Sequence, residues 1–177
     1  MLMGARFETR FAPYQQRLYG FAVAMTGDRD RARDLLHDCV VRAAAARNRP
    51  VDEPAFRAWL FAIMRNLWID QLRAEERRCR MADALSDTMA LVPVSLESMA
   101  VESFAVRQAF EFLSHDHREV LALVDISGFS YQEAADLLGV PRGTVMSRIS
   151  RARQALAGLL TDDGRRVVPL VRKTGQV

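Results

Sequence analysis

Apolar residues recur along this chain at intervals of three and four, the spacing of one face of an α-helix. The first such run covers residues 7–26, and Thr-Gly-Asp at residues 26–28 supplies a helix stop and a turn. A second helix continues as far as Ala45, and a third covers residues 56–78 after a polar loop with two prolines at residues 47–54. No stretch alternates as a strand would. The pattern therefore predicts an all-α fold.

The helical spacing weakens between residues 79 and 100, where acidic residues outnumber basic ones. It returns at residue 101, breaks at residues 114–116 and resumes before residue 128. We therefore predict two small helical domains that are joined by a linker and followed by a short tail. The predicted boundaries are 5–80 for the first domain, 81–100 for the linker, 101–160 for the second domain and 161–177 for the tail.

The second domain ends in a stretch, residues 128–156, that carries the signals of a helix-turn-helix. Ser130 and Glu133 stand three residues apart, so each side chain can bond the backbone amide of the other in a capping box. Gly139 tolerates the positive φ that a helix stop demands, and Pro141 suits a first helical turn. One short helix should therefore begin at Ser130, and another should begin near Pro141.

The last helix of this motif has two distinct faces. An apolar stripe that should be buried consists of Val145, Ile149, Ala152 and Leu156. The opposite side consists of small or polar residues and one arginine, namely Gly143, Ser147, Ser150, Arg151 and Gln154. Three more arginines lie on the flanks between the two faces: Arg142, Arg148 and Arg153. No acidic residue occurs between residues 142 and 154, so this side suits a polyanion better than water. The alternative is a solvated basic helix in a helical bundle.

Composition limits the possible functions. The chain has 177 residues, half of them hydrophobic, and a net charge of +3, so its charge matters chiefly through its location. Cys39 and Cys79 are too few for a disulfide framework or a zinc site. We expect a soluble cytoplasmic protein without a signal peptide or membrane span. No nucleotide loop, metal cluster or catalytic triad is evident, so we expect neither an enzyme nor a cofactor.

Residues in the first domain allow more than one interpretation. His37 beside Asp38 is more typical of a surface position than of a metal or catalytic site. Trp59 and Trp68 could stack on unpaired bases, but tryptophans in helices are more often part of a core. The second helix has a predicted polar face of Asp34, His37, Asp38 and Arg42, and residues predicted to pack inward, namely Leu35, Leu36, Val40 and Val41.

Three stretches together resemble one protein family. They are DLLHDCVVRA from Asp34, FRAWLFAIMRNLWIDQLR from Phe56, and HREVLALVDISGFSYQEAADLLGVPRGTVMSRISRAR from His117. In this order and spacing they resemble bacterial RNA polymerase sigma factors of the extracytoplasmic-function (ECF) group of the sigma-70 family. This group keeps only sigma domains 2 and 4, which agrees with the short acidic linker.

The resemblance implies roles for individual residues. The surface for the polymerase would consist of Asp34, His37, Asp38 and Arg42. The minus-10 element of the promoter would be engaged by Asn66, Asp70 and Arg73, and by Asn48 and Arg49 in a loop that holds a flipped base. The minus-35 element would be engaged by Arg142, Thr144, Met146, Ser147, Arg148, Ser150, Arg151 and Arg153. Met146 stands where the family often has a basic residue, so its contact with a DNA base would be apolar or absent.

The function implied is that of a dissociable initiation factor without catalytic activity of its own. Its partners would be the clamp helices of the largest polymerase subunit, the flap of the second-largest subunit and promoter DNA. The resemblance also implies a role in a stress response and an anti-sigma factor as a further partner. A decoy that binds an anti-sigma factor and never touches promoters is the first alternative. A plain repressor is the second, but it leaves the first 80 or so residues without a role.

Overall fold

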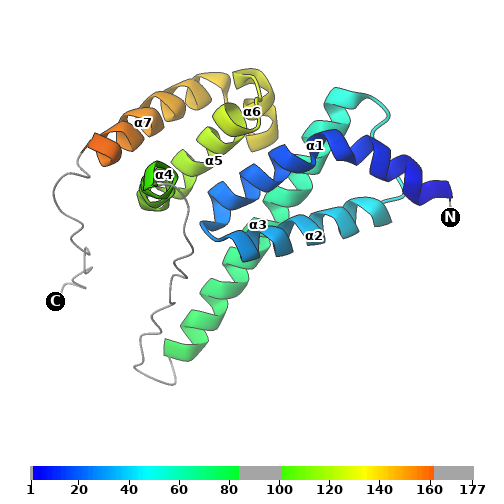
Figure 1. Ribbon diagram of the computed structural model, residues 1–177, viewed down its shortest axis with the longest axis horizontal. Coiled ribbons are helices and arrows are strands. Elements are labelled where there is room, and N and C mark those ends of the chain that lie inside the picture. The colour runs from blue at the N-terminus through cyan, green and yellow to red at the C-terminus, as the bar shows by residue number, and fades with distance from the viewer. Residues whose placement is uncertain (1, 84–100, 162–177) are drawn as a thin grey trace.

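The computed structural model describes residues 2–83 and 101–161, and every element in these two ranges is helical (Figure 1). The predicted all-α fold is therefore confirmed. The elements are α1 (Leu2–Thr26), α2 (Arg29–Ala45), α3 (Glu53–Asp83), α4 (Val101–Phe112), α5 (His115–Leu121), the π-helix η1 (Ala122–Ile126), α6 (Tyr131–Leu138) and α7 (Arg142–Thr161).

The long helix α3 differs in extent from its prediction. It begins at Glu53, within the predicted loop, because Asp52 accepts a hydrogen bond from the amide of Ala55 at 3.1 Å and so caps the first turn. It continues to Asp83, three residues into the predicted linker. The remainder of that linker, residues 84–100, and the tail after Thr161 lie outside the described residues.

The first domain packs α1, α2 and α3 around an aromatic core. Phe21 of α1 meets Phe61 of α3 edge to face, with 5.6 Å between the ring centroids. Trp68 is buried, as expected of a core residue, and Trp59 is half-buried against the ring of Phe56 at 5.6 Å. These packed rings hold α3 in place, so its outer side is presented on a rigid support.

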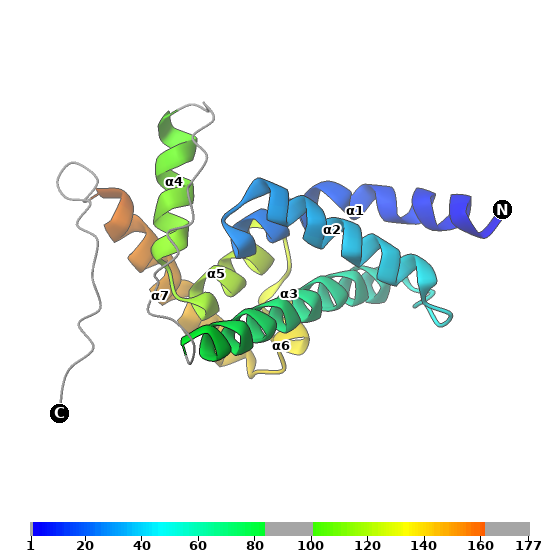
Figure 2. The same ribbon diagram turned by 90° about the horizontal axis from the view of Figure 1, so that it is seen from below.

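The second domain consists of α4 to α7, with α5 running directly into the π-helix η1. The wider turn is seen in the bond from the Ser127 amide to the Ala122 carbonyl at 3.0 Å, five residues back. Gly128 then takes a positive φ of 71°, which ends the helix and directs the chain into the helix-turn-helix. Figure 2 shows α6 beside α3, while α4 projects from the rest of the molecule.

The helix-turn-helix forms by the local signals in its sequence. Ser130 Oγ accepts from the Glu133 amide at 3.2 Å, and Glu133 Oε2 accepts from the Ser130 amide at 2.8 Å, so the capping box is confirmed. Gly139 has a φ of 67° at the end of α6. Pro141 lies one residue before α7, and its carbonyl accepts the first helical bond, from Thr144 N, at 2.9 Å.

The capping box makes part of the stability depend on pH. The pKa of Glu133 is lowered, mainly because its carboxylate accepts hydrogen bonds from the Ser130 amide and hydroxyl, with Arg57 as a weaker cause. A carboxyl whose pKa is lower in the folded than in the unfolded protein stabilises the folded state at pH values above the unfolded pKa of 4.5. This contribution is lost as the pH falls through the lower pKa of the folded state. The free-energy difference between wild type and Glu133→Gln should therefore shrink from pH 7 to pH 3.

Urea unfolding at a series of pH values measures this difference. Glu76→Gln, which removes an exposed carboxyl near the far end of α3, is the matched control and should show little difference at any pH. A Glu133→Gln difference that stays constant with pH would contradict the prediction.

Candidate nucleic-acid and polymerase interface

Helix α7 is anchored on one side by its apolar stripe. Val145, Ile149 and Ala152 are at most 2% exposed, whereas Leu156 is half-buried. The residues expected on the opposite side are all exposed: Gly143, Ser147, Ser150, Arg151 and Gln154. The structure therefore exposes the predicted minus-35 residues Ser147, Ser150 and Arg151 on one face of α7, whereas Thr144 and Arg148 are half-buried. The contact of these residues with DNA stays a prediction.

Side chains on this outer face bond within the helix. Arg151 Nε donates to the Ser147 carbonyl at 3.2 Å, and its Nη2 lies 3.4 Å from Ser147 Oγ. Ser147 Oγ in turn donates to the Thr144 carbonyl at 3.0 Å. Met146 is 48% exposed on the same helix. Because these bonds are exposed, they can be exchanged for bonds to DNA at small cost.

The other arginines of α7 differ in their surroundings. Arg148 pairs with Asp116 of α5 at 2.9 Å. Arg153 forms two bonds with Asp125 of η1, at 2.6 and 3.2 Å, and Asp125 raises its pKa above the usual arginine value. Both acidic partners belong to other elements, so the spacing of residues within α7 could not predict them. Arg142 and Arg151 have no acidic partner among the residues that the structure describes.

The predicted minus-10 residues of α3 also share one exposed face. Asn66, Asp70 and Arg73 are spaced by four and three residues and are all exposed. No neighbouring element within the described ranges covers them. Their grouping agrees with the predicted stripe, and their role in DNA binding remains a prediction.

Of the two residues predicted to engage DNA from the loop before α3, Asn48 and Arg49, only Asn48 is exposed. Asn48 is exposed, whereas the Arg49 side chain turns back onto α2. Its Nε donates to the Ala43 carbonyl at 3.1 Å, its Nη2 donates to the Ala44 carbonyl, and its Cζ lies 4.9 Å from the ring centroid of Phe7. Arg49 thus caps the end of α2, where carbonyls lack helical partners.

Arg10 of α1 fixes this loop, a role that the sequence did not predict. Its Nη1 and Nη2 donate to the carbonyls of Pro50 and Val51, both at 2.7 Å. It also bonds Glu53, lowering the pKa of that carboxyl, and its Cζ lies 4.0 Å from the ring centroid of Phe56. No local signal reveals such a contact, because the partners are about 40 residues apart in sequence.

The predicted polar face of α2 is exposed at Asp34, His37, Asp38 and Arg42. The prediction that Val41 packs inward was wrong, because its side chain is 53% exposed. Val41 follows His37 by four residues and Asp38 by three, so it lies in the middle of the polar face. Helical spacing places Val41 on this face, whereas its apolar character alone led to the prediction that it packs inward. An apolar centre with a charged rim is typical of a protein interface.

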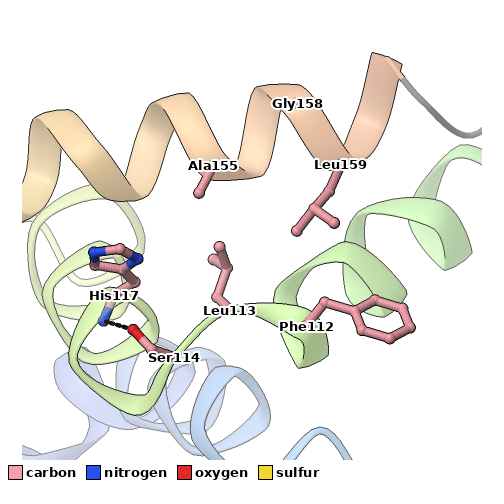
Figure 3. Close-up of a pocket in the computed structure, with 7 residues that line it drawn as sticks. All are labelled: Phe112, Leu113, Ser114, His117, Ala155, Gly158 and Leu159. Carbon is pink, nitrogen blue, oxygen red and sulfur yellow. Dashed lines mark hydrogen bonds between the residues drawn. The ribbon is translucent and has the colours of Figure 1, made fainter. Parts of the chain in front are cut away.

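A shallow groove lies between α7 and the junction of α4 with α5 (Figure 3). Ala155 and Leu159 of α7 point toward Leu113, and His117 and Ser114 lie at one end. The Phe112 ring stands at the open edge and is 63% exposed. The groove is lined by the C-terminal half of α7, whereas Ser147 and Ser150 lie in its N-terminal half, so a protein could occupy the groove while α7 contacts DNA.

The two cysteines are both free. Cys39 is buried, and burial raises the pKa of its thiol to about 12, which makes it unreactive, whereas Cys79 is exposed.

Across residues 2–83 and 101–161, no cluster of three His, Cys, Asp or Glu side chains is arranged to hold a metal ion. Within the same ranges, no helix combines the length and apolar character that a membrane crossing requires.

Comparisons with known proteins match both domains. The family described as "Sigma-70 region 2" matches residues 11–78, and that described as "Sigma-70, region 4" matches residues 103–156. The chain is 38% identical to the ECF RNA polymerase sigma factor EcfG of Rhodopseudomonas palustris over 83% of its own length and 81% of that protein. It is 29% identical to the ECF sigma factor SigM of Bacillus subtilis, covering 82% and 90% of the two chains.

Solved structures agree with these matches. The sigma factor RpoE of Bartonella quintana, in complex with the anti-sigma factor NepR, superposes with a TM-score of 0.69 and 32% identity, covering 89% of this chain and 98% of that one. CnrH in complex with the cytosolic domain of CnrY gives a TM-score of 0.61 and 28% identity, covering 89% and 88%. The fold, both sequence regions and these relatives lead to one conclusion: the chain belongs to the ECF group of the sigma-70 family of RNA polymerase sigma factors.

Proposed function

We propose that this protein binds core RNA polymerase, directs it to promoters through a minus-10 and a minus-35 element, and helps to open the duplex. The observation that supports this most strongly is that one chain has two separate faces suited to DNA, on α3 and α7, and a third suited to protein, on α2. A repressor would need only the face on α7.

At the minus-35 element, we assign base contacts to Ser147, Ser150 and Arg151 because they lie exposed on the outer face of α7. Met146 adds an apolar contact. Arg142 and Thr144 contact phosphates near the start of the helix. Arg148 and Arg153 contact phosphates while held by Asp116 and Asp125, which set their direction.

At the minus-10 element, the exposed face of α3 engages the strand that is being opened. Asn66, Asp70 and Arg73 offer donors and acceptors for unstacked bases. Asn48 lies in the loop that receives a flipped base, and Arg49 supports that loop by capping α2. Binding unpaired bases favours melted DNA without hydrolysis of a nucleotide, so the protein needs no catalysis and no cofactor.

The polymerase is bound at two places. The α2 face with Val41 at its centre binds the clamp helices of the largest subunit, since an exposed apolar residue with charged neighbours fits a protein interface. The groove between α7 and the α4–α5 junction binds the flap of the second-largest subunit. The groove is apolar where Leu113, Ala155 and Leu159 line it, and the exposed Phe112 ring adds to its rim.

An anti-sigma factor is a further proposed partner, because the similar chains RpoE and CnrH were solved as complexes with NepR and CnrY. The protein acts in the cytoplasm, where core polymerase is found. The domain boundaries proposed are 5–80 and 101–160, which include both matched regions.

Run-off transcription with purified core polymerase and a genomic promoter library tests the proposed function against the decoy. We expect initiation at a subset of promoters that share two elements at one spacing, and none with core polymerase alone. Absence of initiation at every promoter, while an anti-sigma factor still binds the protein, would support the decoy and exclude the initiation factor.

The contrast between Arg151 and Arg153 tests the assignment of bases and phosphates. Arg151→Ala should relax the preference at one minus-35 position, with a loss on the order of 1–3 kcal/mol there. Arg153→Ala should weaken binding to all sequences alike and reduce the salt dependence, because a phosphate contact has no sequence preference. Binding measured over a library of minus-35 sequences separates the two effects, and equal losses on every sequence for both variants contradict the assignment.

Val41 tests the clamp interface. Val41→Asp should weaken binding to core polymerase at least about fivefold, since losing an anchor residue commonly costs more than about 1 kcal/mol. Val51→Asp is the matched control, because Val51 is 92% exposed in the loop before α3, away from the α2 face. Titration of labelled core polymerase without DNA measures both variants, and an equal effect of the two would rule out a special role for Val41.

A further inference from the structure

Two acidic residues outside α7 hold two of its arginines. Arg153 Nε and Nη2 donate to the two carboxylate oxygens of Asp125 in η1, at 3.2 and 2.6 Å. Arg148 Nη2 lies 2.9 Å from Asp116 Oδ2 in the first turn of α5. Five residues separate Arg148 from Arg153, which places them about 140° apart around the helix. Each flank of α7 therefore has one arginine that is held by an acid.

The pair of Asp125 and Arg153 is not explained by stability. Their side chains are 38% and 50% exposed, and ion pairs of such exposure contribute little to the free energy of folding. Asp125 is also the penultimate residue of η1, where the negative end of the helix dipole disfavours a carboxylate. An acid at this position needs another reason, and its two bonds to Arg153 indicate one.

The two acids reduce the positive charge that α7 presents to DNA. Four arginines lie between residues 142 and 153. Asp116 and Asp125 offset two of these charges, whereas Arg142 and Arg151 have no acidic partner within the described residues. Attraction to DNA of any sequence grows with the number of phosphates that free cations can neutralise. Half of the arginine charge in this segment is therefore withheld from sequence-independent binding.

An arginine held in this way can still contact a phosphate, but only from one direction. A guanidinium has five N–H donors, and Asp125 accepts from only two of the nitrogens of Arg153. The remaining donors lie in the same plane, so the carboxylate also fixes where they point. Such an arginine suits a phosphate at one position relative to α7, and it adapts poorly to phosphates at other positions.

We propose that Asp116 and Asp125 are positioning residues that set specificity: by holding these two arginines, they weaken binding of α7 to other DNA more than binding to its minus-35 element. This inference rests on the proposed contact of α7 with DNA. Specificity is a difference between two affinities, so a cost that falls mainly on other sequences increases it.

The difference arises from how α7 is placed on each kind of DNA. On the minus-35 element, base contacts of Ser147, Ser150 and Arg151 fix the position of the helix, so the held arginines meet their phosphates already aligned. On other DNA no base contact fixes this position. The arginines must then leave their acids to follow the phosphates, and the lost ion pairs oppose binding.

Asp125→Asn tests this role because it keeps the shape of the side chain and removes its charge. Fluorescence anisotropy measures binding of the full chain to a labelled duplex without a promoter, at about 50 to 200 mM salt. The released Arg153 should steepen the slope of log K against log salt by up to about 0.9 and tighten binding roughly fivefold near 0.1 M salt. Binding to a duplex with the preferred minus-35 sequence should tighten less, so the ratio of the two affinities should fall.

Three further variants separate the held arginine from net charge. Asp136→Asn is the matched control, because it removes the same charge from α6, where the carboxylate accepts from Gln132 and holds no arginine. It should change the slope much less. Asp125→Glu keeps the charge and should keep the wild-type slope. Asp125→Asn combined with Arg153→Ala should bind like Arg153→Ala alone, because the acid then has no arginine to hold.

Circular dichroism checks that each variant is folded. Equal tightening by Asp125→Asn and Asp136→Asn, or tightening by Asp125→Asn that persists without Arg153, would overturn the inference, since either result shows an effect of net charge alone. An unchanged salt slope, or no binding by any variant at low salt, would overturn it as well. The expected duplex results in a protein that never initiates transcription with core polymerase would instead overturn the proposed function and leave this inference intact.

Discussion

The burial of one side of α7 is the constraint on which the proposed DNA contacts depend. Val145, Ile149 and Ala152 are packed away from water, and the helix can therefore turn only its opposite side outward. That side carries small residues and arginines, so the hydrophobic core decides which residues are available to the major groove. The capping box at Ser130 and the left-handed Gly139 fix the angle at which α7 leaves α6.

Local signals predicted this motif well, because capping, helix stops and helical spacing act over a few residues. The boundaries of α6, the exposed face of α7 and the exposed row of Asn66, Asp70 and Arg73 on α3 follow from them. Val41 was misassigned because its apolar character outweighed its position on the helix. The contacts of Arg10 with the loop, of Asp125 with Arg153 and of Arg57 with the Ser127 carbonyl could not be predicted, since these partners are brought together only by the tertiary fold.

Arginine is used in this chain for two distinct purposes. Several arginines hold the protein together: Arg10, Arg49, Arg57 and Arg65 each bond carbonyls, carboxylates or aromatic rings of another element. Others, such as Arg142 and Arg151, lack acidic partners within the described residues and remain available to a polyanion. The same side chain can do both because its planar fork bonds carboxylates and phosphates equally well. Counting basic residues in the sequence could not separate these groups.

The central claim is that two DNA-engaging domains act together with polymerase to open a promoter. Permanganate footprinting, which detects unpaired thymines, combined with protection mapping on a responsive promoter tests it most directly. We expect unpaired bases near the downstream element and protection of an upstream element, both only when core polymerase and this protein are present together. Protection of a single element by the protein alone, without unpaired bases when polymerase is added, would contradict this claim.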